Sequence, residues 1–271
     1  MSKELLVYTD AAVPQDANLI GGDDVITFSV LRSILNVSCT KTVTNHESII
    51  ICYSNAPFPV WVWCKDHTDP KLIAQLSDAL KEHFPAESGY AWNISEALFD
   101  ALKAYDPYFS DIKTDMGLLS YRLEALTAPT RPCSGHFDKI YEDDFELLCK
   151  LWHDACLEME GIDNSEEFCR ERIKRAFEEG SLFTWRNDEG KILAMASRSD
   201  APPLSKVICV YTLPEHRRNG YAMHLVHDVC AGIIEDGLTA ILYTDAGYEA
   251  SNACYRKIGF KEIGSLIKVA K

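Results

Sequence analysis

The fold is decided by the stretch Val210-Tyr-Thr-Leu-Pro-Glu-His-Arg-Arg-Asn-Gly-Tyr-Ala222 and by the residues on either side of it. The preceding run, Lys206–Thr212, is rich in β-branched and aromatic residues, which is typical of a strand. The residues that follow show the apolar spacing of a helix with one buried face, and Gly237 is well placed to end it. These apolar positions are Ala222, Leu225, Val226, Val229, Cys230, Ile233 and Ile234.

The loop between this strand and this helix has the chemistry of an anion site. The first N–H groups of a helix have no intrahelical acceptor, and the helix dipole adds partial positive charge there. Gly220 would let the backbone approach a ligand closely, while Arg217 and Arg218 add charge nearby. We therefore expect a phosphate-bearing ligand over residues 217–222. Because the lysine of a Walker A loop and the repeated glycines of a dinucleotide fingerprint are missing, the loop matches neither motif.

Two segments resemble motifs of one known family. Arg217-x-x-Gly220-x-Ala222 resembles the pyrophosphate-binding signature of the GCN5-related N-acetyltransferases, the GNAT superfamily. The segment Ala250-Ser-Asn-Ala-Cys-Tyr-Arg-Lys-Ile-Gly-Phe260 is similar to that family's closing helix and strand, in which a tyrosine lies four residues before Gly-Phe. The two segments occur in the family's order and at about its spacing. The resemblance implies an α/β fold with a mixed sheet, a GNAT acyltransferase domain in the C-terminal half, and acetyl-CoA (coenzyme A) as the cofactor.

The resemblance also implies roles for particular residues. It assigns the pyrophosphate to the loop residues Arg217, Arg218, Asn219, Gly220, Tyr221 and Ala222. It assigns backbone contacts with the pantetheine arm to Val210, Tyr211 and Thr212, where a splayed strand would offer N–H groups to the thioester carbonyl.

The second motif supplies the residues of the closing helix. Tyr255 matches the tyrosine that protonates the departing thiolate in many members and that also contacts the cofactor. Its alternative role is a packed aromatic residue lining the cofactor channel. Asn252 is expected to contact the cofactor or cap a helix. The sequence departs from the family at Tyr248, where many members carry an asparagine.

Composition limits the classes of partner. The net charge of −14 argues against a nucleic acid or an anionic membrane as the main partner, and solubility alone accounts for the acidity. No signal peptide and no apolar run of membrane-spanning length is visible, so we expect a cytoplasmic protein. The ten cysteines form no C-x-x-C pair, which is typical of reduced, mostly buried thiols. His224, His227 and Cys230 have a spacing that suggests metal, but Cys230 belongs to the apolar face, and we predict no metal site.

The chain is expected to divide at Thr127–Gly135, the stretch between periodic segments that is richest in turn-forming residues. We predict a diverged, smaller GNAT-like domain over 1–130 and the acetyltransferase domain over 136–271, a layout that resembles two-domain bacterial GNAT proteins. In the first half we expect strands over 48–53, 60–63 and 117–126 and helices over 72–84 and 94–105. In the second half we expect strands over 136–142, 181–185, 191–196, 238–244 and from 260, with helices over 145–159, 166–178 and around Asn252.

The resemblance predicts an acetyl-CoA-dependent N-acetyltransferase. The acceptor would be a primary amine of a small molecule, an amino acid or a protein, attacking the thioester directly. The alternatives are a non-catalytic CoA-binding regulatory module and an enzyme that prefers a longer acyl group. The general base stays open among Glu215, His216, Asp245, Glu249 and a chain of waters. A homodimer formed through the first half is compatible with the sequence.

Overall fold

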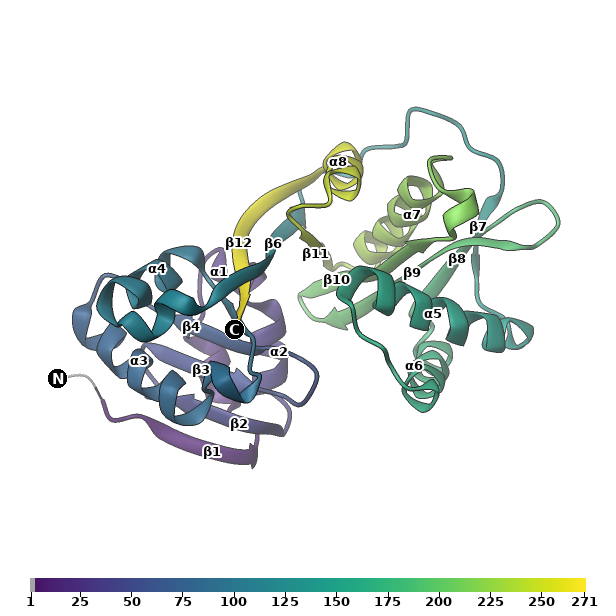
Figure 1. Cartoon of the computed structure of the whole chain (residues 1–271). Helices are drawn as coiled ribbons and strands as arrows, with labels where there is room; N and C mark the ends of the chain where they lie inside the picture. Colours follow the sequence, from purple (N-terminus) through teal and green to yellow (C-terminus); the bar gives the residue numbers. More distant parts are fainter. Residues whose placement is uncertain (1–2) are drawn as a thin grey trace. The chain divides into compact units, whose positions relative to one another are not determined.

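The computed structural model describes residues 3–271 and confirms a mixed α/β architecture (Figure 1). The chain forms two compact units, which are described separately here. Unit 1 contains residues 3–120 with the segments Thr244–Tyr248 and Glu262–Lys271. Unit 2 contains Tyr121–Tyr243 and Glu249–Lys261.

Unit 1 is built on four antiparallel strands followed by a parallel one. The neighbours β1–β2, β2–β3 and β3–β4 pair antiparallel, and β4 pairs parallel with β5. The elements are β1 (Leu6–Ala11), η1 (Pro14–Asn18), α1 (Asp24–Thr27), α2 (Ser29–Leu35), β2 (Cys39–Thr44), β3 (Ile49–Tyr53), β4 (Val60–Cys64), α3 (Pro70–His83), η2 (Ala86–Ser88), β5 (Trp92–Ile94), α4 (Glu96–Tyr105), η3 (Pro107–Asp111) and β6 (Lys113–Leu123), whose last residues lie in unit 2.

Unit 2 repeats this order of elements. The strands β7–β8, β8–β9 and β9–β10 pair antiparallel, and β10 pairs parallel with β11. The elements are β7 (His136–Lys139), η4 (Glu142–Asp144), α5 (Phe145–Glu160), α6 (Glu166–Glu179), β8 (Leu182–Arg186), β9 (Ile192–Ala201), β10 (Leu204–Thr212), η5 (Pro214–His216), α7 (Tyr221–Glu235), β11 (Thr239–Asp245), α8 (Glu249–Ile258) and β12 (Phe260–Ala270).

The last strand explains why unit 1 is not contiguous in sequence. β12 is long, and its final residues pair antiparallel with β5, where Ile267 lies opposite Ile94 and Val269 opposite Trp92. The C-terminal end of the chain therefore completes the sheet of unit 1. The predicted division into domains at 1–130 and 136–271 stays a prediction. The compact units differ from it in one respect, because the C-terminal segment Glu262–Lys271 is grouped with unit 1.

Local chemistry sets the ends of several helices. The side chain of Asp69 accepts a hydrogen bond from the N–H of Lys71 and caps α3, and Pro70 occupies its first turn. Ser165 caps α6 in the same way, by accepting from the N–H of Phe168. The helices α5 and α6 end at left-handed glycines, Gly161 and Gly180, and Gly237 with φ +75° follows α7.

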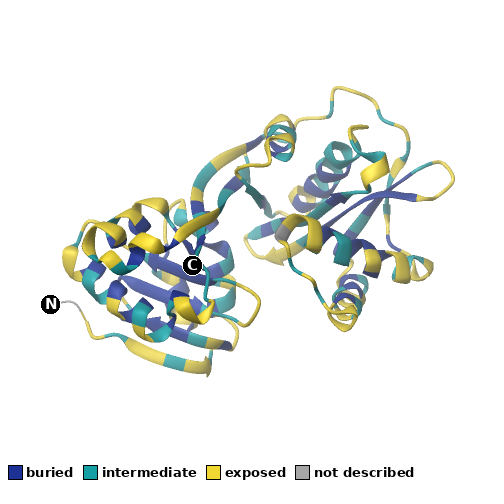
Figure 2. Cartoon of the chain, viewed as in Figure 1, coloured by how far each residue is buried: buried dark blue, intermediate teal, exposed yellow. Residues whose placement is uncertain are grey.

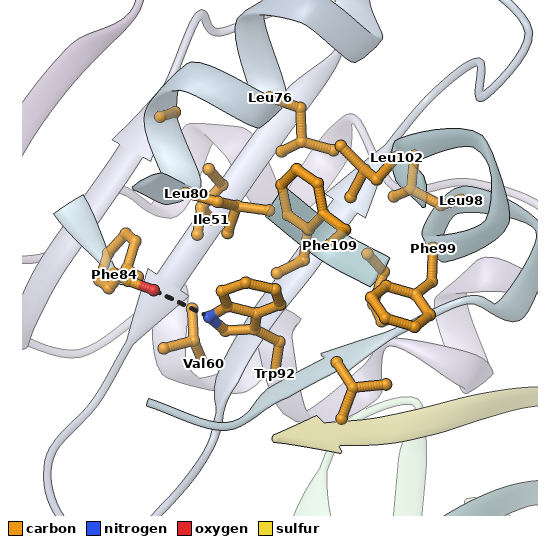
Figure 3. Packing of buried hydrophobic residues seen from close by; sticks show 14 of the residues in the cluster. Ile51, Val60, Leu76, Leu80, Phe84, Trp92, Leu98, Phe99, Leu102 and Phe109 are labelled. Carbon is orange, nitrogen blue, oxygen red and sulfur yellow. Dashed lines mark hydrogen bonds between the residues drawn. The ribbon is translucent and has the colours of Figure 1, made fainter. Parts of the chain in front are cut away.

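Each unit has its own hydrophobic core. In Figure 2 the buried residues follow the strands, and the outward sides of the helices are exposed. Aromatic and aliphatic side chains from β3–β5, α3 and α4 fill the main core of unit 1 (Figure 3). In unit 2, one face of the sheet packs against α5 and α6, with Trp152, Ile173 and Tyr211 among the buried residues. The helix α7 packs against β8, β9 and β10.

Replacing Trp92 tests how much the unit 1 core contributes to the free energy of unfolding. Its side chain is fully buried, and its indole N–H donates to the backbone carbonyl of Phe84 at 3.1 Å (Figure 3). Trp92→Ala leaves a cavity and an unpaired carbonyl, so we expect urea unfolding to show a loss of about 3–5 kcal/mol. The control Tyr105→Ala, at an exposed position of α4, should change stability by less than about 0.5 kcal/mol. A loss below about 1 kcal/mol for Trp92→Ala would contradict the packing seen here.

Most of the expected elements are confirmed. The strand expected over 117–126 runs over Lys113–Leu123, and three other differences have physical causes. The helix expected from residue 94 begins at Glu96, because Ile94 belongs to β5 and Ser95 caps the helix. Ile234, expected on the buried face of α7, is 47% exposed because it lies at the edge of that face, near the end of the helix. The strand expected over 136–142 ends at Lys139, and η4 follows it at Glu142–Asp144.

Candidate functional site

The strand β10 separates from β11 partway along its length. The parallel register runs from Leu204 opposite Thr239 to Val207 opposite Leu242. Beyond it, β10 stays paired with β9, with Tyr211 opposite Met195 and Thr212 opposite Ala194. A bulge lies between Ile208 and Tyr211, and Cys209 within it has φ +50°. The edge of β10 that faces β11 is therefore unpaired with β11 from the bulge onward. We call the place where the two strands separate the fork.

The predicted anion loop lies directly after the fork. The turn η5 leads into residues 217–220, where Arg218 (φ +65°) and Gly220 (φ +90°) adopt left-handed conformations on either side of Asn219. The side-chain amide of Asn219 donates to the carbonyls of His216 and Arg217, at 3.0 and 3.3 Å. The loop thus satisfies its own carbonyls, and its curled backbone is suited to present N–H groups outward.

The helix α7 starts at the end of this loop. The N–H groups of Met223 and His224 donate to the carbonyl of Gly220, so those of Tyr221 and Ala222 are first-turn donors that lack an intrahelical acceptor. A Cβ built on Gly220 would meet nothing within 4 Å. Gly220 is therefore required by its φ of +90° rather than by crowding, and the space above it is open.

The two arginines of the loop have different surroundings. The Arg217 guanidinium donates to the carbonyl of Thr212 (3.0 Å) and to the Glu158 carboxylate of α5 (2.7 Å), and it lies 5.4 Å from the centroid of the Tyr211 ring. The hydrogen bond from Arg217 lowers the pKa of Glu158. Arg217 therefore fastens the loop to β10 and α5. Arg218 is exposed and has no ion pair with any residue in 3–271, which leaves its charge available to a ligand.

Glu158 is a residue that the sequence analysis missed. Its carboxylate also accepts a hydrogen bond from the Tyr211 hydroxyl at 3.3 Å, and burial together with this charge raises the pKa of Tyr211. Glu158 thus joins α5 to both the bulged strand and the loop. It lies 59 residues from Arg217 in the chain, so no local pattern links the two.

The helix α8 carries the residues of the second motif. Asn252 and Tyr255 are buried, with 1% and 8% of their surface exposed. The Tyr255 ring packs edge-on against Phe260, with centroids 6.1 Å apart. Burial raises the pKa of the neighbouring Cys254 thiol to about 11, so this cysteine is not a ready thiolate. All eleven residues predicted for the site lie within unit 2: Val210, Tyr211, Thr212, Arg217, Arg218, Asn219, Gly220, Tyr221, Ala222, Asn252 and Tyr255.

The candidates for the general base differ in their burial. Glu215 and Glu249 are exposed, and Asp245 lies in the segment Thr244–Tyr248 that is grouped with unit 1. His216 is half-buried in η5, and its Nε2 atom is buried without a hydrogen-bond partner. Tyr248, the position that departs from the family, is 55% exposed.

The equivalent helix start in unit 1 is built differently. There the connection from β4 to α3 contains Asp66, whose carboxylate accepts from the N–H and the hydroxyl of Thr68 and which therefore has a lowered pKa. Asp69 accepts from the N–H of Lys71. These carboxylates occupy N–H groups that an anion would need, and their charge repels it. The repeated fold therefore has a helix start without a side-chain cap in unit 2 and a self-capped helix in unit 1.

Three other features of the described residues concern the metal and membrane predictions. Among residues 3–271, no group of three or more His, Cys, Asp or Glu side chains is arranged to hold a metal ion. On α7, the ring of His224 bonds the carbonyl of Arg131, and burial raises the pKa of Cys230 to about 12. None of the helices in the described residues has the length and apolar character needed to cross a membrane.

Comparisons with known proteins identify similar folds. The family model "FR47-like protein" matches residues 185–268, a range that contains both motifs. A GCN5-related N-acetyltransferase from Sphaerobacter thermophilus is similar at 12% identity and a TM-score of 0.73, over 98% of this chain and 94% of that one. A Drosophila protein is similar at 13% identity and a TM-score of 0.67, over 98% of both chains. A GNAT-family acetyltransferase from Colwellia psychrerythraea is similar at 13% identity and a TM-score of 0.62, over 97% of this chain and 98% of that one. No curated protein matches the sequence.

Proposed function

We propose that this chain, which is similar in fold to GNAT acetyltransferases and matches the FR47-like family model over residues 185–268, is an acetyl-CoA-dependent N-acetyltransferase. The acceptor is a primary amine of a small molecule, an amino acid or a protein, which attacks the thioester directly. The observation that carries the proposal is the open anion loop, Arg217–Ala222, placed directly after the fork of β10 and β11. The loop follows the open edge of β10 directly in the chain. This arrangement suits a ligand that has a phosphate at one end, for the loop, and a thioester at the other, for the strand edge.

The residues of unit 2 fit such a ligand. The loop offers the first-turn N–H groups of Tyr221 and Ala222, the exposed charge of Arg218 and open space above Gly220. Arg217, whose charge is compensated by Glu158, would hold the loop in place rather than bind phosphate. When bound, acetyl-CoA supplies an activated acetyl group as a thioester.

The chain's own groups would then perform three tasks. Backbone N–H groups of residues 210–212 would hold a carbonyl oxygen as negative charge grows on it. The hydroxyl of Tyr255, a buried residue, would give a proton to the leaving thiolate, because a phenol is protonated at neutral pH and is a plausible acid when its proton is held close to the sulfur. The bulge at Cys209 turns the edge of β10 away from β11 and so opens the fork.

Release of free CoA tests this proposal. The protein is incubated with acetyl-CoA and a panel of amines, amino acids and peptides, and thiol release is followed over time. We expect release that depends on the amine and on the enzyme concentration. Tight binding of acetyl-CoA without release across the panel would favour the non-catalytic CoA-binding module instead. Absence of acetyl-CoA binding would refute the assignment of the loop.

A further inference from the structure

Three side chains of unit 1 are joined by hydrogen bonds outside the candidate site. The Nδ1 atom of His46 lies 2.7 Å from Oδ1 of Asp16, and the Nε2 atom of the same ring lies 2.6 Å from the hydroxyl of Tyr8. We call Asp16, His46 and Tyr8 the tyrosine triad. They come from three separate segments, namely η1, the connection between β2 and β3, and β1. The fold, rather than the local sequence, therefore brings them together.

The carboxylate of Asp16 fixes which nitrogen of His46 carries a proton. An ionised carboxylate only accepts hydrogen bonds, so the Nδ1–H group of His46 donates to it. In the neutral imidazole the other nitrogen, Nε2, is then an acceptor, and the hydroxyl of Tyr8 donates to it. A hydroxyl bonded to a base that is itself oriented by a third group has the geometry of an activated nucleophile.

The surroundings hold His46 firmly in this position. Asp16 is 1% exposed, and its Oδ2 atom accepts a hydrogen bond from the hydroxyl of Thr44 at 2.6 Å. The same hydroxyl accepts from the backbone N–H of His46 at 3.0 Å, and the side-chain carbonyl of Asn45 accepts from three N–H groups of the turn that follows. His46 has φ +55°, a left-handed conformation that persists only where other contacts impose it. The strained turn thus places the ring between Asp16 and Tyr8.

The nucleophile end of the triad reaches the surface. Tyr8 and His46 are half-buried, in contrast to Asp16. The two rings pack edge-on with centroids 5.5 Å apart, and Tyr8 also packs against the hydrophobic cluster that includes Leu31 of α2. Its strand, β1, is an edge strand with β2 as its neighbour. A small molecule is therefore expected to reach the phenol oxygen from solvent.

The charges around the triad favour a neutral electrophile. Asp16 is a buried carboxylate, and the exposed Glu47 follows His46 in the chain. Transfer of a phosphoryl group requires cations that offset its negative charge. Among the described side chains, no lysine or arginine forms an ion pair or a hydrogen bond with the triad. An acyl group carries no charge, so an activated ester is the class of substrate that fits these surroundings.

We propose that Tyr8 is the nucleophile of a covalent site that accepts an acyl group from an activated ester. The phenol oxygen forms a bond to the acyl carbon as the bond from that carbon to the leaving oxygen breaks. The phenolic proton passes to Nε2 of His46 and then to the leaving group, so the products are the aryl ester of Tyr8 and the free alcohol. This site uses residues of unit 1 alone and does not depend on the proposed function.

Acetylation by 4-nitrophenyl acetate tests this inference. The full chain is treated with the reagent in the absence of acetyl-CoA, and peptide mass spectrometry follows O-acetylation at each tyrosine over time. Hydroxylamine then cleaves aryl esters and leaves amides, which separates tyrosine products from lysine products. We expect Tyr8 to react about tenfold faster or more than Tyr105, which is 51% exposed on α4, because general base catalysis contributes a factor of about 10²–10⁴.

Two substitutions test the roles of the supporting side chains. Asp16→Asn keeps the shape of the side chain, but its amide donates to Nδ1, so Nε2 carries the proton and cannot accept another. His46→Asn removes the base, and asparagine tolerates the left-handed backbone. Each should lower the rate at Tyr8 by about tenfold or more and leave the rate at Tyr105 unchanged. The control His153→Asn, which removes a histidine with a carboxylate partner in unit 2, should leave both rates unchanged.

Two results would overturn the inference. The first is a rate at Tyr8 equal to or below that at Tyr105 in the unaltered protein, a comparison that holds whether or not the variants fold. The second is a fast rate at Tyr8 that survives in both Asp16→Asn and His46→Asn, when urea unfolding shows that both variants are folded. Because acetyl-CoA is absent from this assay, neither result would count against the proposed function.

Discussion

Acetyl-CoA affinity is expected to fall by about a hundredfold or more in Gly220→Trp, while unit 2 stays folded. The indole would fill the open space above the loop and cover the first-turn N–H groups of Tyr221 and Ala222. Loss of two charge-assisted hydrogen bonds to a phosphate accounts for a factor of this size. The left-handed φ of +90° adds backbone strain of about 1–2 kcal/mol for any L-residue, which reduces stability rather than binding.

The matched control separates strain from blocked binding. Gly237 lies at the other end of α7, has φ +75°, and also has open space around it. Gly237→Trp therefore introduces the same side chain under similar strain, away from the loop. Calorimetric titration with acetyl-CoA should give an affinity within about twofold of the unaltered protein for Gly237→Trp. Equal affinities in the two variants would remove the loop from the cofactor site.

Turnover is expected to fall by about a hundredfold in Tyr255→Phe, with acetyl-CoA affinity almost unchanged. The substitution removes one oxygen and keeps the ring that packs against Phe260. General acid catalysis contributes a factor of about 10²–10⁴, so its loss should appear in kcat. Steady-state kinetics with the best acceptor give kcat, and calorimetry gives the affinity for acetyl-CoA.

A second phenol provides the control for Tyr255. Tyr141 is exposed in unit 2, and its hydroxyl donates to Asp138, so Tyr141→Phe also removes one oxygen that makes a hydrogen bond. This variant should keep its full kcat. Unchanged kcat in Tyr255→Phe would exclude the hydroxyl from the chemistry. A parallel loss of affinity and turnover would instead favour the packed aromatic that lines the cofactor channel.

The parts of the fold that sequence patterns predicted are those with local signals. The strand ending at Thr212, the loop at Gly220 and the helix ending before Gly237 each follow from composition and spacing within one short stretch. The strands β8 and β9 and the helices α3, α5 and α6 were predicted for the same reason. The first strand, β1, escaped prediction because it alternates little between buried and exposed positions, and β5 has only three residues.

The candidate site was predictable in its motifs but not in its tertiary contacts. No short sequence pattern indicates that Glu158 forms an ion pair with Arg217. This ion pair gives Arg217 and Arg218 different surroundings, although the two adjacent arginines look equivalent in the sequence. The bulge at Cys209 is also invisible in the sequence, because a left-handed residue is expected to be glycine or asparagine. Exchange of the closing strand depends on pairing between β12 and β5, whose residues are far apart in the chain.

Amide hydrogen exchange with and without acetyl-CoA tests the central claim, that the cofactor binds at the loop of unit 2. We predict that added acetyl-CoA slows exchange in residues 217–222 and 210–212, because their N–H groups become hydrogen-bonded donors. Exchange at residues 70–73, the self-capped start of α3, should not change. Binding of acetyl-CoA with unchanged exchange across 217–222, or with new protection at 70–73, would contradict this account.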